Sequence, residues 1–142
     1  MASKNVATAL AMYDAFNARD YDKMVSAAID NVPWEDHGRG STTKTRAELK
    51  DSLAEWVTGF SDGKITDVKA IDAGDTVIVQ YTGRGTNDGP MGPAPATGKR
   101  ASLDCVDIVH FDKAGKISRG ETYFDMFGLL VQLGLAEMPV KA

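Results

Sequence analysis

The chain contains a single cysteine, Cys105, so it cannot form a disulfide within itself, and nothing in it requires an oxidising compartment. Long apolar runs are also missing. The longest stretch, residues 126–135, is interrupted by Gly128, Gln132 and Gly134 and is too short to span a bilayer. The N-terminus lacks the apolar core of a signal peptide. We therefore expect a soluble, cytoplasmic protein without a membrane partner.

Runs of basic residues are absent as well. The 16 Lys and Arg side chains are outnumbered by 20 Asp and Glu, which gives a formal net charge of −4 spread along the chain. This balance disfavours nucleic acid as a partner. The length of 142 residues allows a substantial core but no second one, so we expect one domain over residues 1–142.

Several motifs that carry chemistry are missing too. The only histidines, His37 and His110, are far apart and belong to no cluster with metal-ligand spacing. No glycine-rich loop follows a strand and opens a helix, as a nucleotide site would require. Cys105 has no basic neighbour in sequence that would lower the pKa of its thiol. We therefore expect no metal and no organic cofactor.

Apolar residues recur at helical spacing in two segments of the first 60 residues. One stripe predicts a helix over about residues 3–18 and consists of Val6, Leu10, Tyr13 and Phe16. The second follows a capping box at Thr45–Glu48 and consists of Leu49, Leu53, Trp56, Val57 and Phe60. Asp20 is a candidate N-cap for a short helix between them. An extended segment over residues 32–37 contains Pro33, which favours a sheet edge or a bulge.

From residue 65 onward the pattern changes to alternation, which predicts strands at about 65–71, 76–84, 99–111 and 116–124. Asp- and Gly-containing turns join the first pair and the last pair. Helices followed by an antiparallel meander indicate an α+β fold with the helices on one sheet face. Asp125 is expected to cap a closing helix.

Residues 85–98 contain three prolines and several glycines, so they form neither a helix nor a central strand. So long a connection suggests either a rim or lid for a site or a flexible hairpin extension. The predicted core comprises Phe16, Leu53, Val79, Phe111 and Leu130.

Alternation decides which strand residues can line a pocket. Asp107 shares its face with Leu103, Cys105, Val109 and Phe111, so it should point inward. Burial should raise the pKa of its carboxyl group, which is how general acids and bases arise. The alternative is that Asp107 pairs with a buried Arg or Tyr and only rigidifies the sheet.

The neighbouring strands contribute further candidates. Thr122 and Phe124 should point inward in the last long strand. Regular alternation would leave Arg84 outside unless a bulge at the adjacent glycines re-aims it. Trp34, Trp56 and Tyr13 are most simply core aromatics, although Trp34 beside Glu35 could form the floor of a pocket.

Four segments of the chain resemble the SnoaL-like polyketide (ester) cyclase family. They are Arg84–Gly89, Pro95–Lys99, Gly115-Lys-Ile and Asp125–Gly134, and the opening Ala15–Asp22 is similar as well. The resemblance covers nearly the whole chain. It implies the cone-shaped α+β barrel of nuclear transport factors, a curved mixed sheet with N-terminal helices over a cavity and a closing C-terminal helix. It also implies a homodimer, a small hydrophobic ligand or substrate, and no cofactor.

Cyclases of this family close a ring by intramolecular aldol condensation with an acid/base Asp. Aligned on the shared motifs, that Asp falls on Thr122, its supporting His on Asp107, and a cavity Gln on Cys105. The Asp–Arg–Asp set of the related limonene epoxide hydrolase corresponds to Thr122, Arg84 and Thr86, of which only the arginine is kept. A threonine hydroxyl is no general base near neutral pH, so the mechanism is either absent or relocated.

The leading hypothesis is therefore a cofactor-independent acid–base enzyme acting on a small hydrophobic molecule. Asp107 would be the displaced acid/base, while Arg84 and Thr122 would orient the substrate or stabilise an enolate oxygen. The predicted substrate-binding residues are Trp34, Glu35, Cys105, Phe124, Tyr13 and Trp56.

Three alternatives use the same fold. The first is a non-catalytic small-molecule-binding module, which the threonine at position 122 favours. The second is an enzyme that resembles epoxide hydrolases or isomerases. The third is a dimeric scaffold whose outer sheet residues, Val106 and Ile108, form only an interface.

Overall fold

The computed structural model describes residues 3–140, which contain four helices and six strands. The helices are α1 (Lys4–Asn17), α2 (Tyr21–Val25), α3 (Arg46–Gly59) and α4 (Met126–Gln132). The strands are β1 (Trp34–Asp36), β2 (Ser41–Thr43), β3 (Lys64–Asp72), β4 (Thr76–Thr86), β5 (Arg100–Phe111) and β6 (Ile117–Phe124). The predicted elements are thus confirmed to within about two residues at each end, and the extended segment after α2 contains a three-residue strand.

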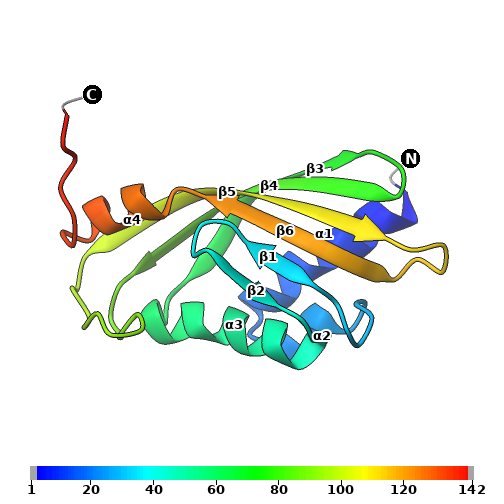
Figure 1. Cartoon of the computed structure of the whole chain (residues 1–142), viewed down its shortest axis with the longest axis horizontal. Helices are drawn as coiled ribbons and strands as arrows, with labels where there is room; N and C mark the ends of the chain where they lie inside the picture. Colours follow the sequence, from blue (N-terminus) through cyan, green and yellow to red (C-terminus); the bar gives the residue numbers. More distant parts are fainter. Residues whose placement is uncertain (1–2, 141–142) are drawn as a thin grey trace.

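One mixed sheet organises the molecule, with the strand order β2-β1-β6-β5-β4-β3. Strands β3 to β6 form the predicted antiparallel meander, and β1 joins it by pairing parallel to β6. The sheet curves over α1, α2 and α3, while α4 lies at one end (Figure 1). The predicted α+β cone is confirmed, with the N-terminal helices on the concave face of the sheet.

Side-chain caps fix the start of each helix. The Ser3 and Thr45 hydroxyls accept from backbone N–H groups three residues later, and the Asp20 carboxylate does the same for α2. Asp125 caps α4 through the Gly128 N–H at 2.8 Å, as predicted. No helix in residues 3–140 is long and apolar enough to cross a membrane.

The main core lies between α1, α2 and the concave face of the sheet. Phe16, Val79 and Phe111 are buried in it, as predicted, whereas Leu53 is half-buried at its margin. The prediction of Leu130 was wrong. Leu129 and Leu133 are buried instead, each only 1% exposed, because residues four apart lie on the same face of a helical turn, and Leu130 is half-buried beside them.

A glycine in β6 sets the position of a pocket aromatic. Gly120 pairs with Trp34 of β1, and a Cβ atom at Gly120 would lie 2.4 Å from the indole ring. Any larger residue would push that ring out of place. The glycine therefore allows Trp34 to lie flat against the sheet and reach toward the next inward residue, Thr122.

The Gly/Pro-rich segment after β4 is an ordered loop that packs against the end of α3. The buried Asn87 amide donates to the carbonyls of Gly59 and Gly89, and its oxygen accepts two bonds from Thr97. Met91 lies against Gly59. None of residues 87–99 lines the main pocket. The loop thus packs against α3 and contributes no side chain to the wall of the main pocket.

Candidate functional site

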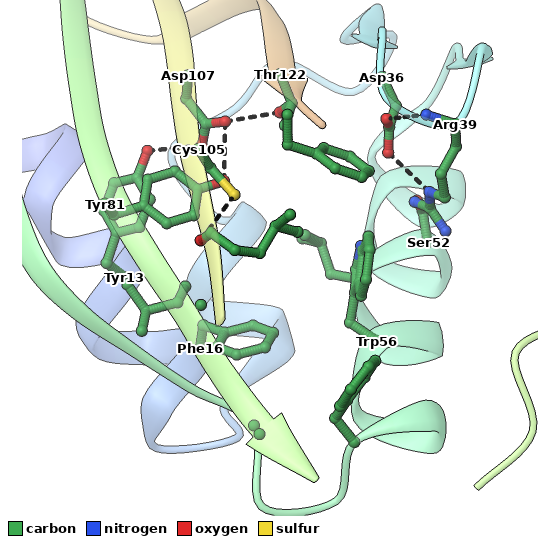
Figure 2. A pocket seen from close by; sticks show the side chains of 18 of the residues that line it. Tyr13, Phe16, Asp36, Arg39, Ser52, Trp56, Tyr81, Cys105, Asp107 and Thr122 are labelled. Atoms are coloured by element: carbon green, nitrogen blue, oxygen red, sulfur yellow. Dashed lines mark hydrogen bonds and ion pairs between the residues drawn. The ribbon is translucent and has the colours of Figure 1, made fainter. Parts of the chain in front are cut away.

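A pocket opens between the concave face of the sheet and the helices, with a cavity volume of about 140 Å³. Aromatic and aliphatic side chains from α1, α3 and the sheet make up most of its wall. Polar side chains gather in two groups. Figure 2 shows Tyr13, Tyr81, Asp107 and Thr122 on one side of the pocket and Asp36, Arg39 and Ser52 on the other.

Strand register explains why these polar groups face one another. Asp36 pairs with Ser41 on one side and with Thr122 on the other, and Thr122 pairs with Asp107. Paired residues in adjacent strands point to the same face of a sheet. Ser41, Asp36, Thr122 and Asp107 therefore form one inward-facing row across four strands. With strands about 4.8 Å apart, the Cα atoms of Asp36 and Asp107 are about 10 Å apart.

Asp107 is 4% exposed and accepts three hydrogen bonds, all from hydroxyl groups. Tyr13 donates to Oδ2 at 2.7 Å, while Thr122 and Tyr81 donate to Oδ1 at 2.7 and 3.0 Å. A carboxylate has about four acceptor positions, so one position on Oδ2 receives no hydrogen bond from the described part of the chain. That position is where a further proton could be received.

Burial raises the pKa of the Asp107 carboxyl group from 3.8 to about 6. The hydrogen bonds from Thr122, Tyr13 and Tyr81 act in the opposite direction and keep the pKa from rising further, because they stabilise the ionised form. The negative charge of Asp36 adds to the rise. Asp107 is therefore ionised at pH 7 yet basic enough to accept a proton, which are the properties of a general base.

The two tyrosines remain neutral donors. Burial, followed by the nearby charge of Asp107, raises the pKa of both Tyr13 and Tyr81 well above its ordinary value of 10. Their rings lie 5.0 Å apart and tilted, which fixes both hydroxyls beside the carboxylate. Proton transfer in this cluster therefore centres on Asp107.

Thr122 is held in a single donor direction. Its oxygen accepts from the Trp34 indole N–H at 2.8 Å, and its proton goes to Asp107. Since an indole N–H can only donate, this chain of two bonds points toward the carboxylate. Thr122 thus positions Asp107 and has no proton left to donate to a ligand.

Cys105 contributes to the pocket wall as a thiol. Burial, followed by the charge of Asp107, raises its pKa to about 12. A thiolate is the nucleophilic form of cysteine, so Cys105 is unreactive at neutral pH.

The second polar group centres on Arg39, in the turn after β1. Its Nε donates to Asp36 at 2.7 Å, and its terminal nitrogens donate to Ser52 and to Glu55. The guanidinium carbon also lies 5.2 Å from the centre of the Trp56 ring. The Asp36 and Arg39 side chains are only 12% and 21% exposed, so the pair is largely withdrawn from water.

Two of the predicted site residues lie apart from the polar groups: Arg84 lines the pocket wall but its guanidinium bonds elsewhere, and Glu35 does not line the pocket. Arg84 is half-exposed and donates to Thr66 and Asp67 of β3. The register of β4 and β5 is unbroken, so no bulge re-aims Arg84, and the irregularity lies in β3 instead. Arg84 is five residues from Val79, the partner of Asp107, or roughly 17 Å along the strand.

Glu35 lies on the outer face, because alternation in β1 turns Trp34 and Asp36 inward and Glu35 outward. Its carboxylate lies 3.3 Å from His37. The expectation that Glu35 shares a pocket floor with Trp34 was therefore wrong about the direction of its side chain.

The other predicted residues do meet in the pocket wall, namely Asp107, Thr122, Tyr13, Trp34, Trp56, Cys105 and Phe124. Sequence reasoning missed five residues of the site, namely Asp36, Arg39, Thr43, Ser52 and Tyr81. Asp36 could have been found, since it stands two residues after Trp34 on the same face of a strand. Arg39 follows the strand in a turn, where alternation gives no direction.

Across residues 3–140, no three His, Cys, Asp or Glu side chains form a group that could hold a metal ion.

The SnoaL-like domain family matches residues 9–120, so the chain belongs to this family. Solved structures share the fold. A protein from Jannaschia sp. CCS1, provisionally named a SnoaL-like polyketide cyclase, has a TM-score of 0.84 and 18% identity, covering 96% of this chain and 99% of its own. AclR from Streptomyces galilaeus has a TM-score of 0.83 and 21% identity, and the match covers 97% of this chain and 89% of AclR.

A third structure, TerC co-crystallised with polyporic acid, has a TM-score of 0.75 and 25% identity, covering 93% of this chain and 99% of TerC. Comparison with curated proteins gave no match.

Proposed function

We propose that this protein is a cofactor-independent acid–base enzyme that removes a proton from a carbon next to a carbonyl group in a small hydrophobic molecule. Asp107 is the base. The observation that carries the proposal is a buried carboxylate with a pKa of about 6 and a free acceptor position, in the wall of a largely apolar pocket.

The proposed reaction needs no oxidant or reductant. Asp107 takes the proton, the electron pair of the C–H bond forms a C–C double bond, and the π pair of the carbonyl bond moves onto its oxygen, which gives an enolate and a neutral carboxylic acid. In an aldol-type ring closure, the enolate carbon then forms a bond to a second carbonyl carbon. The resulting alkoxide recovers the proton from Asp107, so the carboxylate is regenerated.

The hydroxyls around Asp107 assist both halves of the reaction. Tyr13, Tyr81 and Thr122 hold the carboxylate in one orientation, so little reorganisation accompanies proton transfer. Their hydrogen bonds lower the pKa of Asp107, whereas burial raises it, and so they keep Asp107 ionised at neutral pH. Arg84 has no part in the proposal because its guanidinium bonds to β3.

Pocket size supports a ring-sized ligand. The volume of about 140 Å³ is close to that of a protein cavity of about 150 Å³ that binds benzene. The aromatic side chains Phe16, Trp34 and Trp56 offer flat surfaces to such a ring. A larger substrate would place one ring inside and leave the rest at the mouth. The polyporic acid of TerC supports a small organic molecule as the ligand class.

Deuterium exchange tests the proposal. The protein is incubated with 4-phenylbutan-2-one in D2O, and loss of the protons next to the carbonyl is followed by NMR. We expect the wild type to accelerate the exchange and Asp107→Asn to lower the rate by about 10²-fold or more. The matched control is Asp104→Asn, an exposed carboxylate on the outer face of the same strand. Equal rates for Asp107→Asn and the wild type would refute the role of Asp107.

A non-catalytic binding module is the second candidate, because the three hydroxyl donors satisfy Asp107 well enough for a purely structural carboxylate. The same experiment separates the candidates. A binding module would bind the ketone, which a calorimetric titration would detect. The deuterium exchange rate would then equal the uncatalysed rate in buffer without protein.

We also propose a homodimer through the outer face of the sheet. Val106 and Ile108 are half-buried there, and the neighbouring Ile71 and Tyr123 are exposed. Sedimentation equilibrium should give twice the chain mass, and Ile108→Asp should give the mass of one chain. A single-chain mass for the wild type at all concentrations would contradict the dimer.

A further inference from the structure

We infer that the polar group opposite Asp107 is a separate oxyanion site, which binds the carbonyl oxygen that becomes the enolate. It consists of Arg39, Ser52 and Thr43 and is called the Arg39 corner below. This inference rests on the proposed function and adds to it a second set of residues and the orientation of the substrate. It predicts a ligand with an acceptor oxygen at the Arg39 corner and an acidic C–H group at Asp107.

The Arg39 corner contains several donors that lack acceptors. The Thr43 hydroxyl oxygen is buried, lines the pocket, and has no hydrogen-bond partner in the part of the chain that the structure describes. Ser52 accepts from Arg39, and its own proton has no acceptor among residues 3–140. Of the five guanidinium N–H groups, three are taken by Asp36, Glu55 and Ser52. Two remain.

Among residues 3–140 only the Thr43 hydroxyl is a buried side-chain group without a partner, which is costly, and the free protons of Ser52 and Arg39 add donors on the same pocket wall. Because a guanidinium can only donate, this set of groups fits a ligand group that accepts. A carbonyl, enolate or carboxylate oxygen has this property, whereas an amine or ammonium ion does not. Thr43 pairs with Trp34 in the β1–β2 register, so both point to the concave face. The donors therefore converge on the pocket from β2, α3 and the turn after β1.

Electrostatics favour an oxygen whose negative charge develops during the reaction. Asp36 balances the charge of Arg39, and both are largely buried, whereas Glu55 is 70% exposed and solvated. The net charge of the Arg39 corner is thus close to zero, so the corner attracts the uncharged carbonyl oxygen of the substrate only weakly. When Asp107 accepts the proton, one negative charge moves from Asp107 to the substrate oxygen beside the guanidinium. Donors fixed in advance stabilise that charge.

Asp36 is a positioning residue for this site. It accepts from both the backbone N–H and the Nε of Arg39, at 2.8 and 2.7 Å, and so fixes the guanidinium plane. The Trp56 ring supports the same plane from α3. The spacing of about 10 Å between the Asp36 and Asp107 backbones leaves room for one carbonyl-bearing fragment between the two side-chain groups.

Benzoate is a direct probe, because it combines a ring that matches the cavity with an anionic, acceptor-only group. Its affinity is measured by calorimetric titration of the whole protein, together with those of methyl benzoate and benzylamine. We expect benzoate to bind more tightly than the other two, and more tightly at pH 5.5 than at pH 8. Protonation of Asp107 at the lower pH removes the negative charge that repels the benzoate anion. Methyl benzoate is uncharged, so its affinity should not depend on pH in this range.

Thr43→Val is the decisive variant. It removes the unpartnered hydroxyl and keeps the side-chain shape, so it should raise the Tm by about 2 °C or more, because an unsatisfied buried group is lost. At the same time it should weaken benzoate binding about fivefold or more and lower the kcat of ketone exchange, with KM little changed. Thr42→Val is the matched control, since Thr42 is exposed on the opposite face. It should change none of these quantities.

The Asp36→Asn/Arg39→Met double variant removes the buried pair together, so no charge is left without a partner. We expect it to fold and to bind benzoate more than tenfold more weakly. The inference is overturned if Thr43→Val and the double variant bind benzoate as the wild type does, or if benzylamine binds more tightly than benzoate.

These results separate the two proposals. Benzoate binding that depends on Thr43 and Arg39, with no exchange activity, would refute the base role of Asp107 and leave the anion site. Exchange that depends on Asp107, with benzoate binding unaffected by either variant, would refute the Arg39 corner alone.

Discussion

At the scale of single residues, the protein combines a buried carboxylate with donors that are all hydroxyl groups. Among residues 3–140 Asp107 has no cationic partner, and its charge is stabilised by hydrogen bonds from Thr122, Tyr13 and Tyr81. This support is weaker than an ion pair with arginine or lysine would be. The pKa of the carboxyl group therefore stays high enough for proton transfer near neutral pH.

Replacing Tyr81 by phenylalanine should raise the pKa of Asp107 above 6, because one of the bonds that stabilise its ionised form is lost. The ring contact with Tyr13 is retained. The pH–rate profile of ketone exchange should shift to higher pH, so that activity falls at pH 6 and recovers at pH 8. Tyr123→Phe, which lies on the outer face against His37, is the control and should leave the profile unchanged. A profile that does not move in Tyr81→Phe would contradict the assignment.

The sequence predicts the position of Asp107 but not its environment. Alternation within one strand is enough to turn the carboxylate inward, because the period of a strand is local. Its donors come from α1, β4 and β6, and Tyr13 is 94 residues away along the chain. Partners so distant depend on packing, which no local pattern encodes.

At the scale of elements, the parallel pairing of β1 with β6 brings the two polar groups into one row. The helices and the long strands could be predicted because their periodic patterns extend over many residues. Strand β1 has only three residues, too few for a clear pattern, and its pairing with β6 spans most of the chain. The inward direction of Asp36 could be inferred from Trp34, but its pairing with Thr122 and the role of Arg39 were beyond prediction from the sequence.

The loop after β4 illustrates a second limit. Its prolines and glycines exclude regular structure but do not indicate that one buried amide can order it. Asn87 is 1% exposed and makes four side-chain hydrogen bonds, to Gly59, Gly89 and Thr97. A loop that contains this many turn-forming residues can thus be rigid.

Asn87→Ala should destabilise the protein by about 2–4 kcal/mol, since it leaves buried backbone and hydroxyl groups without partners. Urea denaturation provides the measurement. The control is Asn31→Ala, at an exposed position, for which we expect a change within about 0.5 kcal/mol. Equal stabilities for the two variants would show that the amide does not order the loop.

At the scale of the whole molecule, Asp107 couples folding to pH. Its pKa is about 6 in the folded protein, against 3.8 for an ordinary aspartate, so the folded state retains a proton that the unfolded chain has lost. The stability that this group contributes is fully present below about pH 4 and is lost as the pH rises through about 6. The shift corresponds to about 3 kcal/mol.

We therefore expect the wild type to lose stability relative to Asp107→Asn between pH 4 and pH 8, by an amount of this order. The difference between their unfolding free energies, from urea denaturation at each pH, cancels the titration of other groups. A difference that is constant across this range, or one that favours the wild type more as the pH rises, would contradict a raised pKa.

The most direct test of the account is an NMR titration of the Asp107 carboxyl carbon in protein labelled with ¹³C at aspartate, assigned by its absence in Asp107→Asn. The account predicts a midpoint at about pH 6. A midpoint near the ordinary value of about 3.9, or below it, would contradict the account. It would mean that the hydroxyls hold Asp107 as a structural anion with too little basicity to remove a proton from carbon.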